Sequence, residues 1–94
     1  MNYLVGDIGN TFIKISILND NLKIKKTYNL QTKKIYQDTS KKKFLNKLKK
    51  KELYGKVLFS SVVPKAFKII KKNLLKKKFD VLEIKEIDIK KIIK

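Results

Sequence analysis

Cysteine, histidine and arginine are all missing from this 94-residue sequence. Without cysteine there can be no disulfide, no thiolate chemistry and no Cys-ligated metal. Without histidine there is no imidazole base and no His-ligated zinc. Acid–base or metal chemistry must therefore rest on the eight acidic residues, the lysines or the tyrosines.

Long apolar runs are also missing. No segment is apolar over a length that could cross a membrane. The N-terminus has no basic stretch followed by an apolar one, so we expect neither a signal peptide nor a membrane partner. The length permits one domain with a modest core. Because no internal repeat, low-complexity linker or domain boundary is visible, we expect residues 1–94 to form that single domain.

Positive charge is what the sequence has in excess, because 25 lysines and eight acidic residues give a net charge of +17. Such a balance is typical of nucleic-acid binding, but a surface selected for that role would be expected to contain arginine. Ile and Asn are abundant, while Gly, Ala and Pro together number five, as in proteins of A- and T-rich genomes. We interpret much of the charge as mutational background, with nonspecific polyanion binding at low salt still open.

Apolar patterning predicts three strands at the start of the chain. Residues 3–6 form a continuous apolar run, as in a central strand that is buried on both faces. Residues 12–18 alternate between two faces. After a turn at residues 19–21, residues 22–30 form a third strand. Lys26 breaks the alternation of this strand, which favours a place at the edge of the sheet.

A lysine-rich segment after a polar connection predicts the first helix. Thr39 or Ser40 could cap this helix, which is expected to run to about Leu53. Its apolar positions Phe44, Leu45 and Leu48 lie on one side. Tyr54 and Gly55 are expected to end it, because glycine readily adopts a helix-stop conformation.

The rest of the chain predicts a strand, a helix and another strand. Residues 57–59 are apolar and form the fourth strand, and Pro64 begins the second helix at its first turn. Helical spacing predicts a buried stripe on that helix, made by Phe67, Ile70 and Leu74. Residues 80–84 form a short fifth strand, and residues 86–94 allow no assignment.

The expected order of elements is β-β-β-α-β-α-β, an α/β arrangement. A three-strand meander followed by βαβ crossovers is the arrangement of the ribonuclease-H-like fold. In that fold the first strand is central, and it pairs with the second strand on one side and with the fourth strand on the other. We therefore expect a mixed sheet of this kind.

Between the first two strands the sequence reads Asp7-Ile8-Gly9-Asn10-Thr11. Asp7 would face the edge of the sheet where α/β proteins usually bind ligands, and its carboxylate can hold Mg²⁺ directly or through water. Gly9 lets the backbone approach a phosphate and aims an amide at it, and Lys14 could reach the same phosphate. The alternative is an ordinary hairpin turn, since these residues are common turn formers.

Two serines follow the fourth strand. Because that strand should lie beside the first, the hydroxyls of Ser60 and Ser61 would open onto the same edge as Asp7. The alternative is that they cap the helix that begins at Pro64. A serine-nucleophile triad is excluded, because there is no histidine.

The two motifs together resemble a known family. Asp7-Ile8-Gly9-Asn10-Thr11, followed by Ile13-Lys14, resembles the first phosphate-binding motif of the acetate and sugar kinase, Hsc70 and actin superfamily. Ser60-Ser61-Val62-Val63-Pro64 resembles one family within it, type III pantothenate kinase. The resemblance implies phosphoryl transfer from ATP to pantothenate, the first step of coenzyme A synthesis. It further implies a cytoplasmic homodimer that requires Mg²⁺ and a monovalent cation, K⁺ or NH₄⁺.

The resemblance also implies roles for individual residues. Ser60 and Ser61 would form a loop on the substrate side, and Asp7 would hold Mg²⁺, directly or through water. The ATP phosphates would lie on Asp7, Ile8, Gly9, Asn10, Thr11, Phe12, Ile13 and Lys14.

The sequence departs from that family in one respect that concerns catalysis. Family members are longer, with two ribonuclease-H-like halves, and their catalytic aspartate lies in a Gly-x-Asp-Arg motif after the fifth strand. This sequence has no arginine and no glycine after Gly55. We therefore expect an N-terminal part that is inactive as a kinase by itself. Two alternatives stay open, a lysine-rich nucleic-acid-binding module and a non-catalytic regulatory relative.

Overall fold

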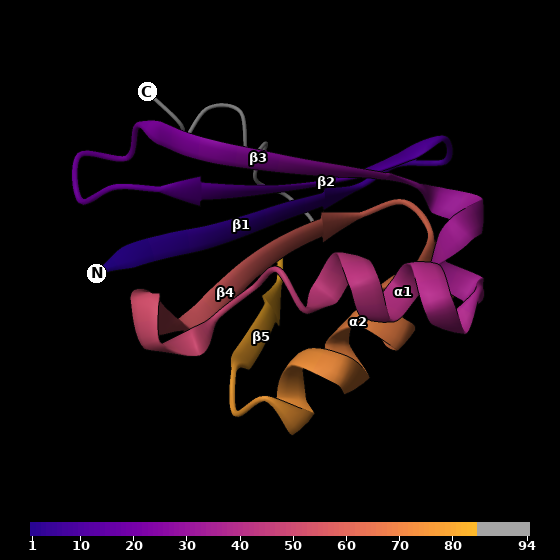
Figure 1. The fold of residues 1–94 in the computed structure, drawn as a ribbon. Coiled ribbons are helices and arrows are strands. Elements are labelled where there is room, and N and C mark those ends of the chain that lie inside the picture. The colour runs from indigo at the N-terminus through magenta and orange to yellow at the C-terminus, as the bar shows by residue number, and fades with distance from the viewer. Residues whose placement is uncertain (85–94) are drawn as a thin grey trace.

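The computed structural model describes residues 1–84, and within them the strands form one mixed sheet (Figure 1). The strands are β1 (Asn2–Ile8), β2 (Phe12–Leu18), β3 (Ile24–Gln31), β4 (Leu53–Ser61) and β5 (Asp80–Glu83). Their order across the sheet is β3-β2-β1-β4-β5. β1 runs antiparallel to β2 and parallel to β4. This topology confirms the ribonuclease-H-like prediction, with the first strand at the centre and β3 at an edge.

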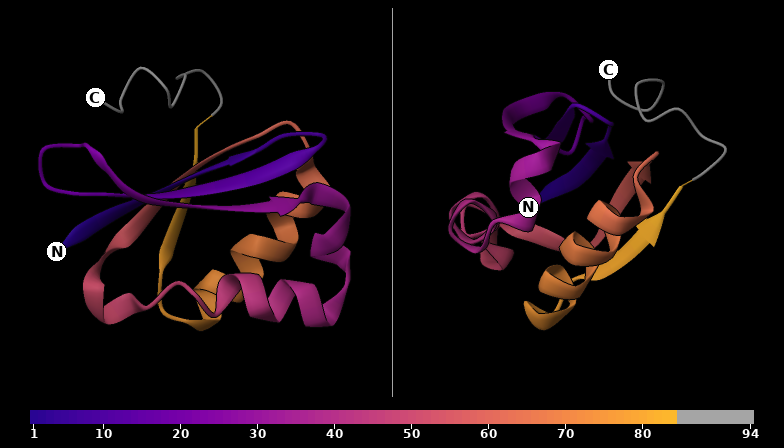
Figure 2. Two further views of the ribbon diagram at one scale, coloured as in Figure 1. Left: turned by 45° about the horizontal axis from the view of Figure 1, so that its top comes forward. Right: turned by 90° about the vertical axis from the view of Figure 1, so that its right-hand side faces the viewer.

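Two α-helices lie on the same face of the sheet (Figures 1 and 2). They are α1 (Asp38–Leu45) and α2 (Pro64–Lys76), and two short 3₁₀ helices, η1 (Thr32–Tyr36) and η2 (Lys50–Glu52), flank α1 along the chain. Pro64 begins α2 as predicted, and Phe67, Ile70 and Leu74 are buried. No helix within residues 1–84 has the length and apolarity needed to span a bilayer.

The side chains of β1 alternate between the helix side and the open side of the sheet. Leu4 and Ile8 belong to the main core beneath the helices, whereas Val5 belongs to a small cluster on the other face. Gly6 lies on the helix side against Phe59, which is fully buried. A Cβ atom on Gly6 would overlap the Phe59 ring, so glycine is required for this close approach.

The first helix is shorter than predicted. α1 begins at Asp38, with no side-chain cap from Thr39 or Ser40, and it ends at Leu45. Leu53 begins β4 and pairs with the first residue of β1. The prediction was wrong because lysine and leucine have high helix propensity, whereas pairing with β1 fixes this segment as a strand.

The predicted helix stop is also wrong. Tyr54 and Gly55 lie inside β4, and no glycine within residues 1–84 has a positive φ. The Tyr54 ring packs against Tyr3 of β1, with 4.6 Å between ring centroids. Aromatic pairs across neighbouring strands stabilise a sheet, so this contact favours a strand at Tyr54 over the end of a helix.

Lys77 joins the ends of the two helices. Its ammonium donates a hydrogen bond of 2.7 Å to the carbonyl oxygen of Leu45, the last residue of α1. A cation at this place complements the negative end of the α1 dipole. Partial burial lowers the pKa of the Lys77 ammonium. The hydrogen bond to Leu45 links the end of α1 to the end of α2.

Candidate functional site

The strand register brings three polar side chains into one row. Asp7 of β1 lies opposite Lys14 of β2 and opposite Ser60 of β4. Residues directly opposite each other on paired strands project from the same face of a sheet. Asp7 and Lys14 are exposed and Ser60 is half-buried. A carboxylate, an ammonium and a hydroxyl thus share the face that lies away from α1 and α2.

Asp7 and Lys14 are neighbours without being an ion pair. Within residues 1–84, the one ion pair joins Lys41 to Asp38. Neither side chain is therefore engaged by the other in an ion pair. An acidic group beside a basic one suits a ligand that brings a metal cation and an anion together.

The turn between β1 and β2 is closed by a backbone hydrogen bond. The Gly9 N–H donates to the carbonyl oxygen of Phe12 over 2.9 Å, so this amide is used inside the hairpin and does not point at a phosphate. A Cβ atom on Gly9 would lie 3.3 Å from the same oxygen and would crowd the turn. In the described part of the chain, the N–H groups of Asn10 and Thr11 have no hydrogen-bond partner. These two amides are the ones free for an anion.

Thr32 holds this turn from the end of β3. Its hydroxyl donates a hydrogen bond of 2.7 Å to the Gly9 carbonyl oxygen, and its N–H donates one of 2.9 Å to the Thr11 carbonyl oxygen. Its side chain is 3% exposed. Sequence reasoning missed Thr32, which lies in what was read as a polar connection. The pairing of Phe12 with Gln31, which only the structure shows, places residue 32 beside the turn.

We expect Thr32→Val to destabilise the protein by about 1 kcal/mol, because the Gly9 carbonyl oxygen loses its donor while the shape of the side chain is kept. Thr32→Ser keeps the donor and should recover most of this loss. Urea unfolding of the three proteins measures both effects. Equal stability of the valine variant and the wild type would show that the hydroxyl does not hold the turn.

The two serines lie at the end of β4 and not in the loop after it. Ser60 is in the row with Asp7, whereas Ser61 pairs with Ile8 on the helix side. The Ser61 hydroxyl accepts a hydrogen bond of 3.0 Å from the Val63 N–H, so it shapes the turn before α2. Only Ser60 is thus placed beside Asp7.

The other predicted loop residues divide into two kinds. Ile8 and Ile13 are fully buried and pair with each other, so they anchor the turn to the core. Phe12 is 53% exposed, and Val62, whose N–H donates to the Ile8 carbonyl oxygen, is 66% exposed. These two side chains give the edge of the sheet an apolar part beside its polar row.

The donor set fits Mg²⁺ only if a ligand supplies further oxygens. Within residues 1–84 no three acidic side chains come together at one place, and Asp7 is the carboxylate of the row. Mg²⁺ keeps several waters and is commonly held by one or two carboxylates together with substrate phosphates. Asp7 therefore fits a metal that arrives with a phosphorylated ligand, and it does not fit a cage made by protein alone.

Comparison with known proteins identifies a family for this chain. A family model described as type III pantothenate kinase matches residues 3–94, which is nearly the whole sequence. A search of curated proteins found no match. The matched range includes both the turn after β1 and the end of β4. The chain therefore belongs to the type III pantothenate kinase family.

Proposed function

We propose that residues 7–14 bind the phosphates of Mg²⁺-ATP for the phosphorylation of pantothenate. The observation that carries this proposal is the row of Asp7, Lys14 and Ser60 beside a turn with two free amides. Membership of an ATP-dependent kinase family supports it. By the family resemblance, the proposal includes a monovalent cation, K⁺ or NH₄⁺, and a cytoplasmic homodimer.

The chemistry of the proposed site is positioning and charge neutralisation, which is most of what phosphoryl transfer requires from a protein. The Lys14 ammonium and the Asn10 and Thr11 amides would contact phosphate oxygens. Asp7 would orient Mg²⁺, which when bound neutralises the charge of those oxygens. The Ser60 hydroxyl lies on the other side of Asp7 and would face the acceptor substrate.

These residues do not include the family's catalytic motif. The sequence has no arginine, so Gly-x-Asp-Arg is not among its 94 residues. We infer that these residues bind nucleotide but do not by themselves remove the proton from the acceptor hydroxyl. Tyr3, Phe12 and Leu82 are exposed by 38%, 53% and 44%, and they give such a protein apolar surface to bury against a second half or subunit.

The 94-residue chain is expected to bind ATP in a Mg²⁺-dependent manner without turning over pantothenate. Calorimetric titration with and without Mg²⁺ measures the first, and production of ADP in the presence of pantothenate measures the second. Saturable binding that requires Mg²⁺ would support the proposed loop. Absence of any Mg²⁺-dependent binding would contradict it, and measured turnover would contradict the inference about the missing catalytic motif.

A further inference from the structure

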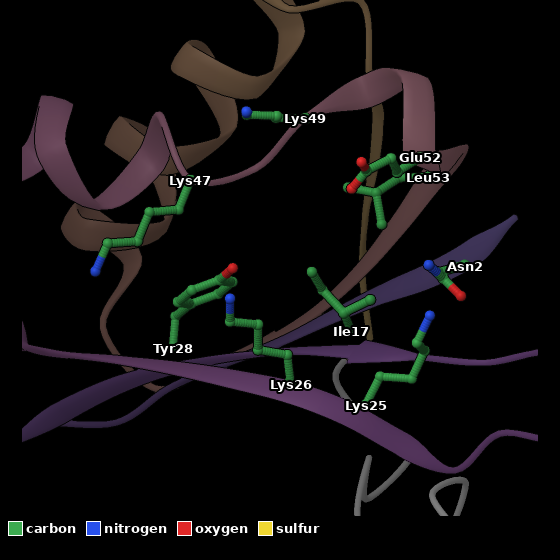
Figure 3. Close-up of a pocket in the computed structure, with 9 residues that line it drawn as sticks. All are labelled: Asn2, Ile17, Lys25, Lys26, Tyr28, Lys47, Lys49, Glu52 and Leu53. Atoms are coloured by element: carbon green, nitrogen blue, oxygen red, sulfur yellow. The ribbon is translucent and has the colours of Figure 1, made fainter.

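A cavity of about 210 Å³ lies at the opposite end of the sheet from Asp7. Figure 3 shows the residues that line it. Its wall includes Asn2, which begins β1, whereas Asp7 lies near the end of that strand. Asp7 lies five residues further along the strand, which corresponds to roughly 17 Å. Ile17 and Leu53 give the cavity an apolar wall. The cavity is thus separate from the proposed ATP site.

A β-bulge in β3 directs two consecutive lysines to this cavity. Ile17 pairs with Lys26 and Leu18 with Ile24, so Lys25 is an extra residue in the ladder. Neighbouring residues of a regular strand face opposite sides, whereas a bulge re-aims a side chain. Both lysines line the cavity as a result. In Figure 3, Lys26 lies toward Tyr28 and Lys25 toward Asn2.

Two ammonium groups from distant parts of the chain meet at the Tyr28 ring. The Nζ atom of Lys26 lies 5.2 Å from the ring centroid, and that of Lys47, from the segment after α1, lies 5.4 Å from it. The ring attracts each cation through its quadrupole, which holds together two groups that repel each other. Both lysines are thereby held beside the Tyr28 ring, and in Figure 3 the Lys47 ammonium lies on the side of Tyr28 away from Ile17.

The charge of the cavity is not neutralised by the protein. Its titratable cationic and acidic lining consists of Lys25, Lys26, Lys47, Lys49 and Glu52. None of these side chains takes part in an ion pair, since in the part of the chain that the structure describes the ion pair is Lys41–Asp38. Four positive charges against one negative charge leave the cavity ready for an anion.

We propose that this cavity binds a small phosphorylated anion of about the size of pyrophosphate. The lysine ammonium is a strongly hydrated point charge that commonly binds phosphate, and the Tyr28 hydroxyl and Asn2 amide add neutral donors. The volume of 210 Å³ is below the roughly 300–1,000 Å³ of pockets for drug-sized ligands. The size therefore favours a compact anion over a long one.

Inorganic pyrophosphate is the probe for the test, titrated into the labelled 94-residue chain at 150 mM salt with a chelator in place of Mg²⁺. This salt screens diffuse attraction by surface lysines, because the Debye length is then about 8 Å. The chelator removes the metal that the proposed ATP site requires. Saturable shifts of the backbone amide resonances of Ile17, Lys26 and Tyr28 are expected, with little change at Asn10 and Thr11.

A pair of double variants separates this cavity from the general charge of the chain. Lys26→Gln with Lys47→Gln should weaken pyrophosphate binding by at least about tenfold. Lys42→Gln with Lys76→Gln removes the same charge from exposed positions outside the cavity, and it should leave the affinity within about twofold. Far-UV circular dichroism checks that both variants keep the fold.

Three results would overturn the proposal. The first is the absence of saturable binding at this salt concentration, and the second is an equal loss of affinity in the two double variants. The third is a single-stranded RNA that shifts the resonances of the cavity residues while pyrophosphate does not. That result would assign these lysines to a nucleic-acid surface.

Discussion

Asp7→Asn is expected to weaken Mg²⁺-dependent ATP binding by about 100-fold while leaving the fold intact. Mutation of a residue that only supports a metal ligand commonly lowers metal affinity by about 10–100-fold. Asp7 is proposed to hold the metal itself, so its loss should have at least this effect. No cluster of three acidic side chains lies within residues 1–84 to replace it. Asparagine has the same shape and Asp7 is exposed, so stability should change little. Calorimetric titration with ATP at fixed Mg²⁺ measures the effect.

Asp80→Asn is the matched control for this prediction. Asp80 is an exposed carboxylate at the first residue of β5, and its substitution removes the same charge from a position away from the turn. The affinity of this variant for Mg²⁺-ATP should remain that of the wild type. Equal affinities of the Asp7 and Asp80 variants for Mg²⁺-ATP would show that Asp7 does not hold the metal.

Gly6→Ala is expected to cause the largest loss of stability, about 3 kcal/mol or more. The added methyl group would overlap the ring of Phe59, which is fully buried and packs against Phe67 with 6.2 Å between ring centroids. Because Phe67 belongs to α2, a shift of the Phe59 ring would disturb the contact between α2 and the sheet. Such a loss is a large part of the 5–15 kcal/mol by which domains are typically stable. Urea unfolding measures it.

A double-mutant cycle tests whether the Phe59 ring is the cause. Phe59→Val removes the ring and should itself destabilise by about 3 kcal/mol, because it leaves a cavity. In that background, Gly6→Ala should cost less than about 1 kcal/mol, since the overlapping atoms are gone. Additive effects of the two substitutions would show that the close approach of Gly6 and Phe59 does not limit stability.

Much of the fold could be predicted because its first strands are encoded locally. The alternating run at Phe12–Leu18 forms a strand with the predicted bounds, and Pro64 begins α2 as predicted. The segment that includes Leu53 and Gly55 could not be predicted in this way. Its lysines and leucines fit a helix, whereas its pairing with β1 depends on residues far away in the sequence.

The candidate site, like the fold, could be predicted from the sequence only in part. The prediction that the first and fourth strands are neighbours placed Ser60 at the edge where Asp7 lies, and the structure has both in one row. Two roles were not visible in the sequence. That of Thr32 depends on how the end of β3 meets the turn, and that of the Gly9 amide depends on the hydrogen bond to Phe12 that closes the turn. The irregular alternation at Lys26 indicated an edge strand, but only the register shows the bulge.

The central claim is that the turn after β1 holds the phosphates of Mg²⁺-ATP. Its most direct test is a titration of the isotopically labelled chain with a non-hydrolysable ATP analogue and Mg²⁺, followed by the backbone amide resonances. The account predicts saturable shifts at Asn10, Thr11 and Lys14 that disappear when Mg²⁺ is removed. Saturable binding that leaves these three resonances unchanged, or no binding at all, would contradict it.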